Sequence, residues 1–267
     1  MKHPQPRGLT RRRVAQLLSE TKYDRSTGSR IDILSRHFLG HSYEPSPLIG
    51  SADTSEVFTA SLDGFDCVTY IETILALARA ANVDDFSEWL RKIRYEQGCI
   101  RWERRNHYMT LWIRNNVRER IIRSVAIPAV PIVSRERVLN VVPGLAARRT
   151  RLKCVPKPAV RRLAAYLQSG DLIFFISTRK NLDVFHAGII VRHGKNMLMR
   201  HASRSQGGVV EQELSQFLKA NRMSGVIVMR PQGLTRRVAL GNQVAGSSMR
   251  RIPSSQGREG AKRRGGM

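Results

Sequence analysis

One long segment that is apolar on almost every side constrains the fold most. Residues 65–81 read FDCVTYIETILALARAA and are nearly unbroken in helix-forming residues. A helix of this kind has no polar face for water, so the rest of the chain must surround it. No apolar run in the sequence approaches the ~18–20 residues of a membrane helix. We therefore expect a buried central helix and no transmembrane segment.

Helical patterns dominate the chain before Gly170. Apolar residues recur at helical spacing in residues 10–20, 29–38, 84–97, 106–116 and 157–168. Thr10 is placed to cap the first of these helices, and Gly40 ends the second. The segments 41–56 and 121–142 contain Pro, Gly, Ser or β-branched residues and predict loop and irregular strand.

After Gly170 the pattern changes to short strands. They are expected at residues 171–177, 187–192, 196–201 and 225–229, with another beginning at Val209 and a short helix over 213–220. The tripeptide His193-Gly194-Lys195 predicts a hairpin between two of the strands. Helices first and strands later are typical of an α+β domain with a largely antiparallel sheet.

The chain is strongly basic, with 46 Lys and Arg against 21 Asp and Glu and a formal charge of +25. About half of the excess lies in residues 1–30 and 231–267, and basic ends of this kind can contact anionic polymer or lipid non-specifically. Aromatic residues that could stack on bases do not alternate with the basic ones, so we expect no specific nucleic-acid partner. Beyond Pro231 the chain is rich in Gly, Ser and Arg, which predicts disorder.

Cys67 is the most informative of the three cysteines. It falls in the first turn of the central helix, directly after Asp66, which can cap that helix. The helix dipole and the free backbone N–H groups at this position favour a thiolate and can stabilise an oxyanion during acyl transfer. The alternative is a buried structural cysteine, since free Cys is among the most buried residue types. Cys99 and Cys154, the latter expected in a loop, complete neither a disulfide framework nor a structural zinc site, and we interpret both as incidental.

A nucleophilic thiol needs a base, and two histidines are suitably placed. His186 begins an apolar strand, and His201 ends the next strand across a short hairpin. In an antiparallel pair the two side chains can lie side by side. His186 can then take the thiol proton while His201 orients and polarises it. Two alternatives are ordinary polar residues at strand ends and a zinc site formed by Cys67, His186 and His201.

Taken in order, the motifs of this sequence resemble the NlpC/P60 cysteine peptidase superfamily, and more closely its N-acetylmuramoyl-L-alanine amidase-like branch, DUF1460. The matching motifs are FLGHSY (38–43), LDGFDCVTYIET (62–73), RNHY (105–108), GDLIFF (170–175), HAGII (186–190) and HAS (201–203). The resemblance extends from about residue 10 to Pro231. It implies a papain-like core, with the nucleophile at the N-terminus of a buried helix packed on the sheet.

The resemblance also implies a reaction. The bond cut is the amide between the muramic lactyl group and L-Ala in bacterial peptidoglycan or its fragments. By motif position Cys67 is the nucleophile, His186 the general base and His201 the third, orienting member. No metal or other cofactor is needed, and peptidoglycan or a muropeptide is the specific partner.

Five further positions lie in the matching motifs. Tyr43 matches a tyrosine that lies close to the nucleophile in this superfamily, where its hydroxyl can hold the substrate or the oxyanion. The others, expected to bind substrate or support the site, are Asp66, Asn106, His107 and Ser203.

The resemblance divides the chain into a basic extension (1–9), the amidase domain (10–231) and a basic tail (232–267). Residues 82–156 are long for a minimal domain of this superfamily and are expected to form an inserted region that shapes the cleft. Within it, Arg104 and Arg105 either pair with a carboxylate of the stem peptide or belong to a solvated basic loop.

Two alternative functions and the location stay open at this point. The same triad would serve an endopeptidase that cuts the stem peptide between D-Glu and the diamino acid. A basic protein that binds cell-wall polymer or nucleic acid, with an inactive site, would account for the charge. The family leads us to expect a periplasmic or extracytoplasmic location. The first 20 residues lack the apolar stretch of about 7–15 residues that a signal peptide requires, which leaves a cytoplasmic location open.

Overall fold

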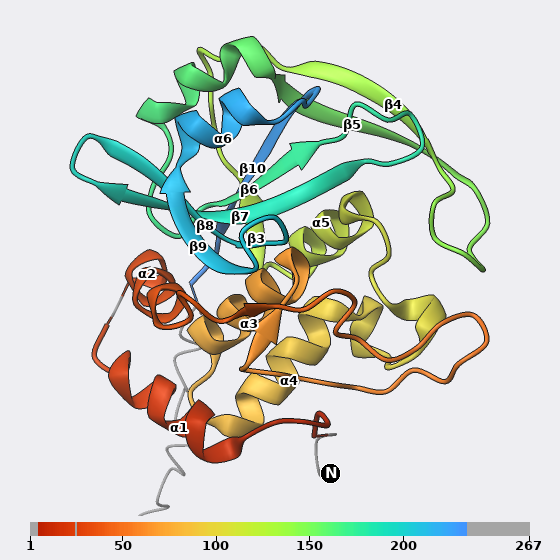
Figure 1. The fold of residues 1–267 in the computed structure, drawn as a ribbon, viewed down its shortest axis with the longest axis vertical. Coiled ribbons are helices and arrows are strands. Elements are labelled where there is room, and N and C mark those ends of the chain that lie inside the picture. Colours follow the sequence, from red (N-terminus) through yellow and green to blue (C-terminus); the bar gives the residue numbers. More distant parts are fainter. Residues whose placement is uncertain (1–4, 25, 234–267) are drawn as a thin grey trace, which may run out of the picture. The chain divides into compact units, whose positions relative to one another are not determined.

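The apolar central segment forms helix α3 (Cys67–Arg79), and residues 69–79 within it are all buried. The computed structural model describes residues 5–24 and 26–233. Three helices pack around α3: α1 (Arg11–Glu20), α2 (Thr27–His37) and α4 (Val83–Arg94) (Figure 1). The prediction of a buried central helix is confirmed, because its apolar surface is covered by these helices and by the sheet.

A ten-stranded sheet forms the other layer of the described domain. The strands run in the order β2-β1-β9-β8-β7-β6-β10-β5-β4, and β3 pairs separately with β10. Their bounds are β1 Ser42–Tyr43, β2 Gly64–Phe65, β3 Ile122–Ser124, β4 Val133–Leu139, β5 Arg148–Pro156, β6 Leu172–Ile176, β7 Val184–His193, β8 Asn196–Ser203, β9 Gly208–Glu213 and β10 Gly225–Pro231. These strands pair antiparallel, except β1 with β2. The α+β class predicted from the sequence is confirmed.

Each face of the sheet carries a hydrophobic core. Phe174 of β6 belongs to the core around α3, where its ring centroid lies 5.8 Å from that of Trp112. Phe175 points to the opposite face and lies 4.5 Å from Phe217 of helix α6 (Leu214–Ala220). Successive residues of a strand face opposite sides, so β6 separates the two cores. Figure 1 shows α6 and α3 on opposite sides of the sheet.

Three expected helices differ in detail. The helix over 84–97 ends at Arg94 and is followed by the 3₁₀ turn η1 (Glu96–Gly98), in which Gln97 has a φ of 53° that an α-helix does not accommodate. The segment 157–168 forms the 3₁₀ helix η3 (Lys157–Ala165) rather than an α-helix. Thr10 occupies the N-cap position of α1, but its side chain makes no capping hydrogen bond.

The region 82–156 contains more strand than the sequence predicts. After the 3₁₀ turn η2 (Trp102–Arg104) and helix α5 (Met109–Arg118), strands β4 and β5 form a hairpin. Cys154 lies buried in β5, opposite Val133, so its expected position in a loop is wrong. The sequence of β5, RRTRLKCVP, hides the strand because basic residues fill its exposed positions.

Two further expectations concern membrane-spanning segments and the disorder of the basic tail. No helix among the described residues is both long enough and apolar enough to cross a membrane. The disorder predicted for the basic tail covers residues 232–267. It is wrong for Gln232, whose backbone N–H donates to the Ile121 carbonyl (2.9 Å) and whose side chain donates to the Ile122 carbonyl (3.0 Å). Residues 234–267 of the tail and residues 1–4 of the basic extension lie outside the described residues.

Candidate active site

Asp66 caps helix α3 and so fixes the position of Cys67. Its Oδ1 accepts hydrogen bonds from the backbone N–H groups of Val68 (3.0 Å) and Thr69 (2.7 Å). The Thr69 hydroxyl oxygen accepts one from the N–H of Asp66 (3.0 Å), which completes a capping box. Cys67 is the first residue of the helix and is half-buried.

The Cys67 side chain is a neutral thiol in this environment. Desolvation and the negative charge of Asp66 raise the pKa of Cys67 to about 12. The backbone N–H groups of Ala187 and of Cys67 itself lower it, but by less. The start of the helix therefore does not lower the pKa of Cys67 in the free protein as expected, because the loss of water around the sulfur and the charge of Asp66 outweigh the backbone N–H groups.

His186 and His201 come together in the sheet. His186 stands near the start of β7, opposite Phe175 of β6, and His201 lies near the end of β8, opposite Val210 of β9. Strands β7 and β8 pair antiparallel, and the Nε2 atom of His186 lies 2.6 Å from the Nδ1 atom of His201. The two imidazole rings are nearly perpendicular, at 85°.

Both imidazoles are neutral at pH 7. Burial, followed by the nearby His201, lowers the pKa of His186 to about 3, and burial lowers the pKa of His201 to about 4. An apolar wall accounts for the burial: the ring of Phe217 lies 5.3 Å from that of His186 and 5.5 Å from that of His201. Phe217 was not predicted as a wall of the site, because in the sequence it is only one apolar residue of a short helix.

The hydrogen bond between the histidines leaves one nitrogen of each ring outside it. On His186 this is Nδ1, the atom that can accept a proton from a thiol. On His201 it is Nε2, which is buried and has no hydrogen-bond partner among the described residues. For His186 to hold a free Nδ1, its Nε2–H must donate to His201, and His201 must then carry its own proton on the buried Nε2.

Cys67 lies beside the strand that carries His186. The Ala187 backbone N–H, in the residue directly after His186, interacts with the Cys67 sulfur. No hydrogen bond among the described residues joins that sulfur to the imidazole of His186. The structure thus brings the thiol to the backbone of β7 next to the two histidines, with the sulfur and the imidazole not bonded to each other.

Tyr43 and Ser203 lie on β1 and β8, the two strands on either side of β9. Tyr43 of β1 pairs with Phe65 of β2, immediately before the Asp66–Cys67 pair. Burial, followed by the charges of Cys67 and Asp66, raises the pKa of Tyr43, so its phenol is close to both. Ser203 is buried at the end of β8, where its Oγ accepts a hydrogen bond from the N–H of Gln206 (3.3 Å). A direct contact of either residue with substrate stays a prediction.

Asn106 and His107 make packing contacts of their own. The Asn106 side chain donates to the Ile93 carbonyl (3.0 Å) and accepts from Asn115 (2.6 Å). The His107 Nε2 atom lies 2.9 Å from the Trp102 carbonyl oxygen, and its ring packs edge-on against the Trp102 indole. These contacts give both residues a structural role, and their proposed role in binding substrate stays a prediction.

Arg104 and Arg105 are already paired with acidic side chains. Arg104 forms an ion pair of 2.9 Å with Glu96, and Arg105 pairs with the buried carboxylate of Glu56. Neither guanidinium is therefore a free cation for a substrate carboxylate. The description of a solvated basic loop fails for Arg105, whose side chain is 14% exposed.

Asp183 is a buried residue that the sequence analysis did not single out. Its Oδ2 accepts a hydrogen bond from the N–H of Thr110 (2.7 Å), at the start of α5, and its Oδ1 accepts one from the N–H of Val184 (2.7 Å). Asp183 therefore ties α5 to the end of β7 that carries His186. Within residues 5–24 and 26–233, no three His, Cys, Asp or Glu side chains cluster in a way that would hold a metal ion.

Comparisons with known proteins place this geometry in a family. The family model described as "AmiA-like: N-acetylmuramoyl-L-alanine amidase-like" matches residues 33–226. A solved N-acetylmuramoyl-L-alanine amidase from Bacteroides uniformis is similar, with 26% sequence identity, a TM-score of 0.68 and coverage of 77% of this chain and 99% of that chain.

A second solved structure shares the fold. A DUF1460 protein from Legionella pneumophila is 19% identical, with a TM-score of 0.74 and coverage of 83% of this chain and 94% of that chain. No curated protein matches the chain. The family match covers well over half of the sequence and includes Cys67, His186 and His201. The chain therefore belongs to the N-acetylmuramoyl-L-alanine amidase-like family.

Proposed function

We propose that this protein is a cysteine-dependent N-acetylmuramoyl-L-alanine amidase with an NlpC/P60-type, papain-like site. The observation that carries the proposal is the 2.6 Å contact between His186 and His201, next to a thiol at the first residue of a buried helix. The family match supports the substrate class, peptidoglycan or its fragments. We also propose that the protein acts outside the cytoplasmic membrane, where intact peptidoglycan lies.

The reaction begins with proton transfer from Cys67 to the free Nδ1 of His186. Because both groups are neutral at rest, this transfer accompanies attack of the sulfur on the lactyl carbonyl carbon. The negative charge that develops on the carbonyl oxygen is stabilised by backbone N–H groups at the start of α3 and by the hydroxyl of Tyr43. The Nδ1 atom of His201 accepts a hydrogen bond from the Nε2–H of His186 and so stabilises the imidazolium form of His186.

The second half of the reaction releases both products. His186 gives its proton to the L-Ala nitrogen, the C–N bond breaks, and the free stem peptide leaves a thioester on Cys67. A water molecule then attacks the thioester carbonyl, and His186 accepts a proton from that water. The C–S bond breaks, the Cys67 thiolate recovers a proton from His186, and the lactyl carboxylic acid leaves and gives its own proton to solvent.

Mass spectrometry of the products tests the proposal. Muropeptides with and without a 1,6-anhydro sugar end are incubated with wild-type protein, with Cys67→Ala and with Cys99→Ala, the exposed cysteine that serves as the matched control. We expect free stem peptide and peptide-free sugar from the wild type and from Cys99→Ala, and no product from Cys67→Ala.

Other products would identify a different function. Shortened stems that stay attached to sugar would identify an endopeptidase. No turnover by a folded wild-type protein would contradict the enzymatic proposal and favour a basic binding protein. Stoichiometric zinc in purified active protein, lost in Cys67→Ala, would contradict the thiol mechanism and favour the zinc site.

A further inference from the structure

A cavity of about 380 Å³ lies between helix α5 and strands β5 and β10, within the usual size range of small-molecule sites. Its apolar lining includes Leu152 and Met229 of the core around α3, and Ile227, which packs against that core. The cavity therefore lies on the α3 side of the sheet. The two imidazoles of the candidate active site pack against Phe217 on the opposite side. None of the candidate site residues lines the cavity, so a ligand bound there occupies a separate site.

The charged side chains around the cavity are all basic. Its lining includes arginines and a lysine, and no described Asp or Glu. Arg151 forms an ion pair of 2.6 Å with Glu136. The charged groups of Arg114, Arg148 and Lys153 make no hydrogen bond or ion pair with any described residue. The lining therefore carries positive charge that no acidic side chain within residues 5–24 and 26–233 compensates.

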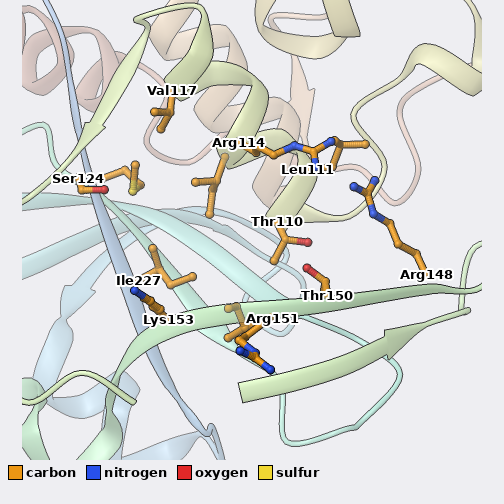
Figure 2. A pocket seen from close by; sticks show the side chains of 13 residues that line it. Thr110, Leu111, Arg114, Val117, Ser124, Arg148, Thr150, Arg151, Lys153 and Ile227 are labelled. Carbon is orange, nitrogen blue, oxygen red and sulfur yellow. The ribbon is translucent and has the colours of Figure 1, made fainter. Parts of the chain in front are cut away.

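Two of these cationic groups share the cavity with two hydroxyl groups. Figure 2 shows the Arg114 side chain extending from α5 toward that of Arg148 on β5. The same view shows the side-chain oxygens of Thr110 and Thr150 facing one another across the cavity. Neither hydroxyl makes a hydrogen bond with a described residue. The cavity thus presents hydrogen-bond donors from a helix and a strand that are available to a ligand.

A phosphate monoester matches these donors better than a carboxylate does. It carries nearly two negative charges at neutral pH and three strong acceptor oxygens, whereas a carboxylate carries one charge on two oxygens. Each guanidinium can donate two parallel N–H···O bonds to such an anion. The phosphate therefore balances the charge of both Arg114 and Arg148, and its remaining oxygen can accept a hydrogen bond from a threonine hydroxyl.

We infer that the cavity binds a ligand in which a phosphate monoester is joined to an apolar group. The phosphate lies between Arg114 and Arg148, and the apolar group covers Leu152 and Met229. A phosphate ion alone would leave this apolar lining in contact with water, whereas an attached hydrocarbon group removes it from water. This binding function goes beyond the proposed amidase reaction and does not depend on it.

Titration calorimetry with the full-length wild-type protein tests the inference without turnover. The probes are n-butyl phosphate, inorganic phosphate and pentanoate, which carries the same butyl chain on a carboxylate. n-Butyl phosphate should bind at least about tenfold more tightly than inorganic phosphate, because its chain covers the apolar lining. It should bind about tenfold more tightly than pentanoate, because the dianion engages both arginines. Equal affinity for n-butyl phosphate and either of the other probes would overturn the inference.

Substitution of the two arginines locates the site. Arg114→Gln/Arg148→Gln should weaken binding of n-butyl phosphate at least about tenfold. Arg114→Lys/Arg148→Lys keeps the charge but loses the paired donors, and should weaken binding about threefold or more. The matched control, Arg135→Gln/Arg149→Gln, changes two exposed arginines of β4 and β5 that do not line the cavity, and should bind like the wild type. Equal losses in the two Gln variants would overturn the inference, because net charge alone would then explain the binding.

Two sources present this chemistry, a soluble phosphate ester and the headgroup of phosphatidic acid, and sedimentation with vesicles distinguishes them. If phosphatidylcholine vesicles that contain phosphatidic acid sediment the wild type but not Arg114→Gln/Arg148→Gln, the inference holds and the ligand is a lipid. If n-butyl phosphate separates the two proteins and the vesicles do not, it holds and the ligand is a soluble ester. If neither probe separates the two proteins, the inference is wrong.

Discussion

His186 and His201 are joined through Nε2 and Nδ1 at 2.6 Å, inside an apolar wall that keeps both rings neutral. This contact determines which nitrogen of His186 is available to accept a proton from the thiol. With Nε2 bound to His201, Nδ1 is the one left to accept the thiol proton. The cost is a buried Nε2 on His201 that has no hydrogen-bond partner within residues 5–24 and 26–233. We interpret this unsatisfied atom as the consequence of holding His186 in one tautomer.

Substitution of His201 tests this positioning role. His201→Ala should lower kcat about 100-fold with little change in KM, because His186 loses the acceptor that orients it. His201→Gln offers a carbonyl oxygen to the same Nε2–H and should recover about tenfold of that loss. Steady-state kinetics on a muropeptide measure both. Equal activity of His201→Ala and the wild type would remove His201 from the mechanism.

The pKa values predict the acid limb of the activity profile. His186, with a pKa of about 3, stays an unprotonated base down to well below its ordinary value of 6.5. The kcat/KM of the wild type should therefore hold constant from pH 8 to about pH 5 and fall only at lower pH. His201 lowers the pKa of His186. In His201→Gln that pKa should therefore rise, and the acid limb of the kcat/KM profile should move toward higher pH. A wild-type limb centred between pH 6 and 7 would contradict a neutral, buried pair.

Replacement of Asp66 separates its cap from its charge. Asp66→Asn keeps a side-chain oxygen for the cap but removes the negative charge that raises the pKa of Cys67. Iodoacetamide should then alkylate Cys67 faster, with the free energy of unfolding almost unchanged. Asp66→Ala should speed alkylation similarly and cost about 1 kcal/mol of stability, because the cap is lost. The rates are followed by mass spectrometry in a Cys99→Ser background. If Cys67 is alkylated at the same rate with Asn and with Asp at position 66, the charge of Asp66 does not raise the pKa of the thiol.

The histidine pair also makes stability depend on pH. Below pH 6.5 the unfolded chain takes up protons on His186 and His201, whereas the folded protein does not until about pH 4 and below. Stability therefore falls as the pH drops through this window. Between pH 7 and pH 5 the wild type should lose about 4 kcal/mol more than a His186→Gln/His201→Gln variant, about 2 kcal/mol for each histidine, as measured by urea denaturation. Parallel losses in the two proteins would show that other groups control the pH dependence.

A buried ion pair between α3 and α4 should be important for stability. Arg94 lies 2.7 Å from Glu72, and both side chains are at most 3% exposed. Arg94→Met leaves the carboxylate buried without its cation and should lower the free energy of unfolding by about 3–5 kcal/mol. Arg104→Met breaks the half-exposed pair with Glu96 and should cost less than about 1 kcal/mol. Chemical denaturation measures the free energy of unfolding of both variants. Similar decreases for Arg94→Met and Arg104→Met would contradict the conclusion that burial makes the Arg94–Glu72 pair important.

The sequence was sufficient to predict the elements that depend on local patterns. The apolar run after Asp66 predicts α3, because a helix without a polar face must be buried. The hairpin signal at residues 193–195 predicts the pairing of β7 with β8, and with it the approach of His186 and His201. Strand β5 was not predicted, because its exposed arginines hide the alternation that marks a strand.

By itself the sequence determined that Cys67 begins a buried helix and that two histidines stand at the ends of adjacent strands. Only the tertiary structure decided that the thiol and both imidazoles are neutral, since a pKa depends on desolvation and on charges brought close by folding. It alone paired Arg105 with Glu56, so that this guanidinium is not free for a substrate carboxylate. Those relationships join residues that are far apart in the chain, and no local pattern encodes such distances.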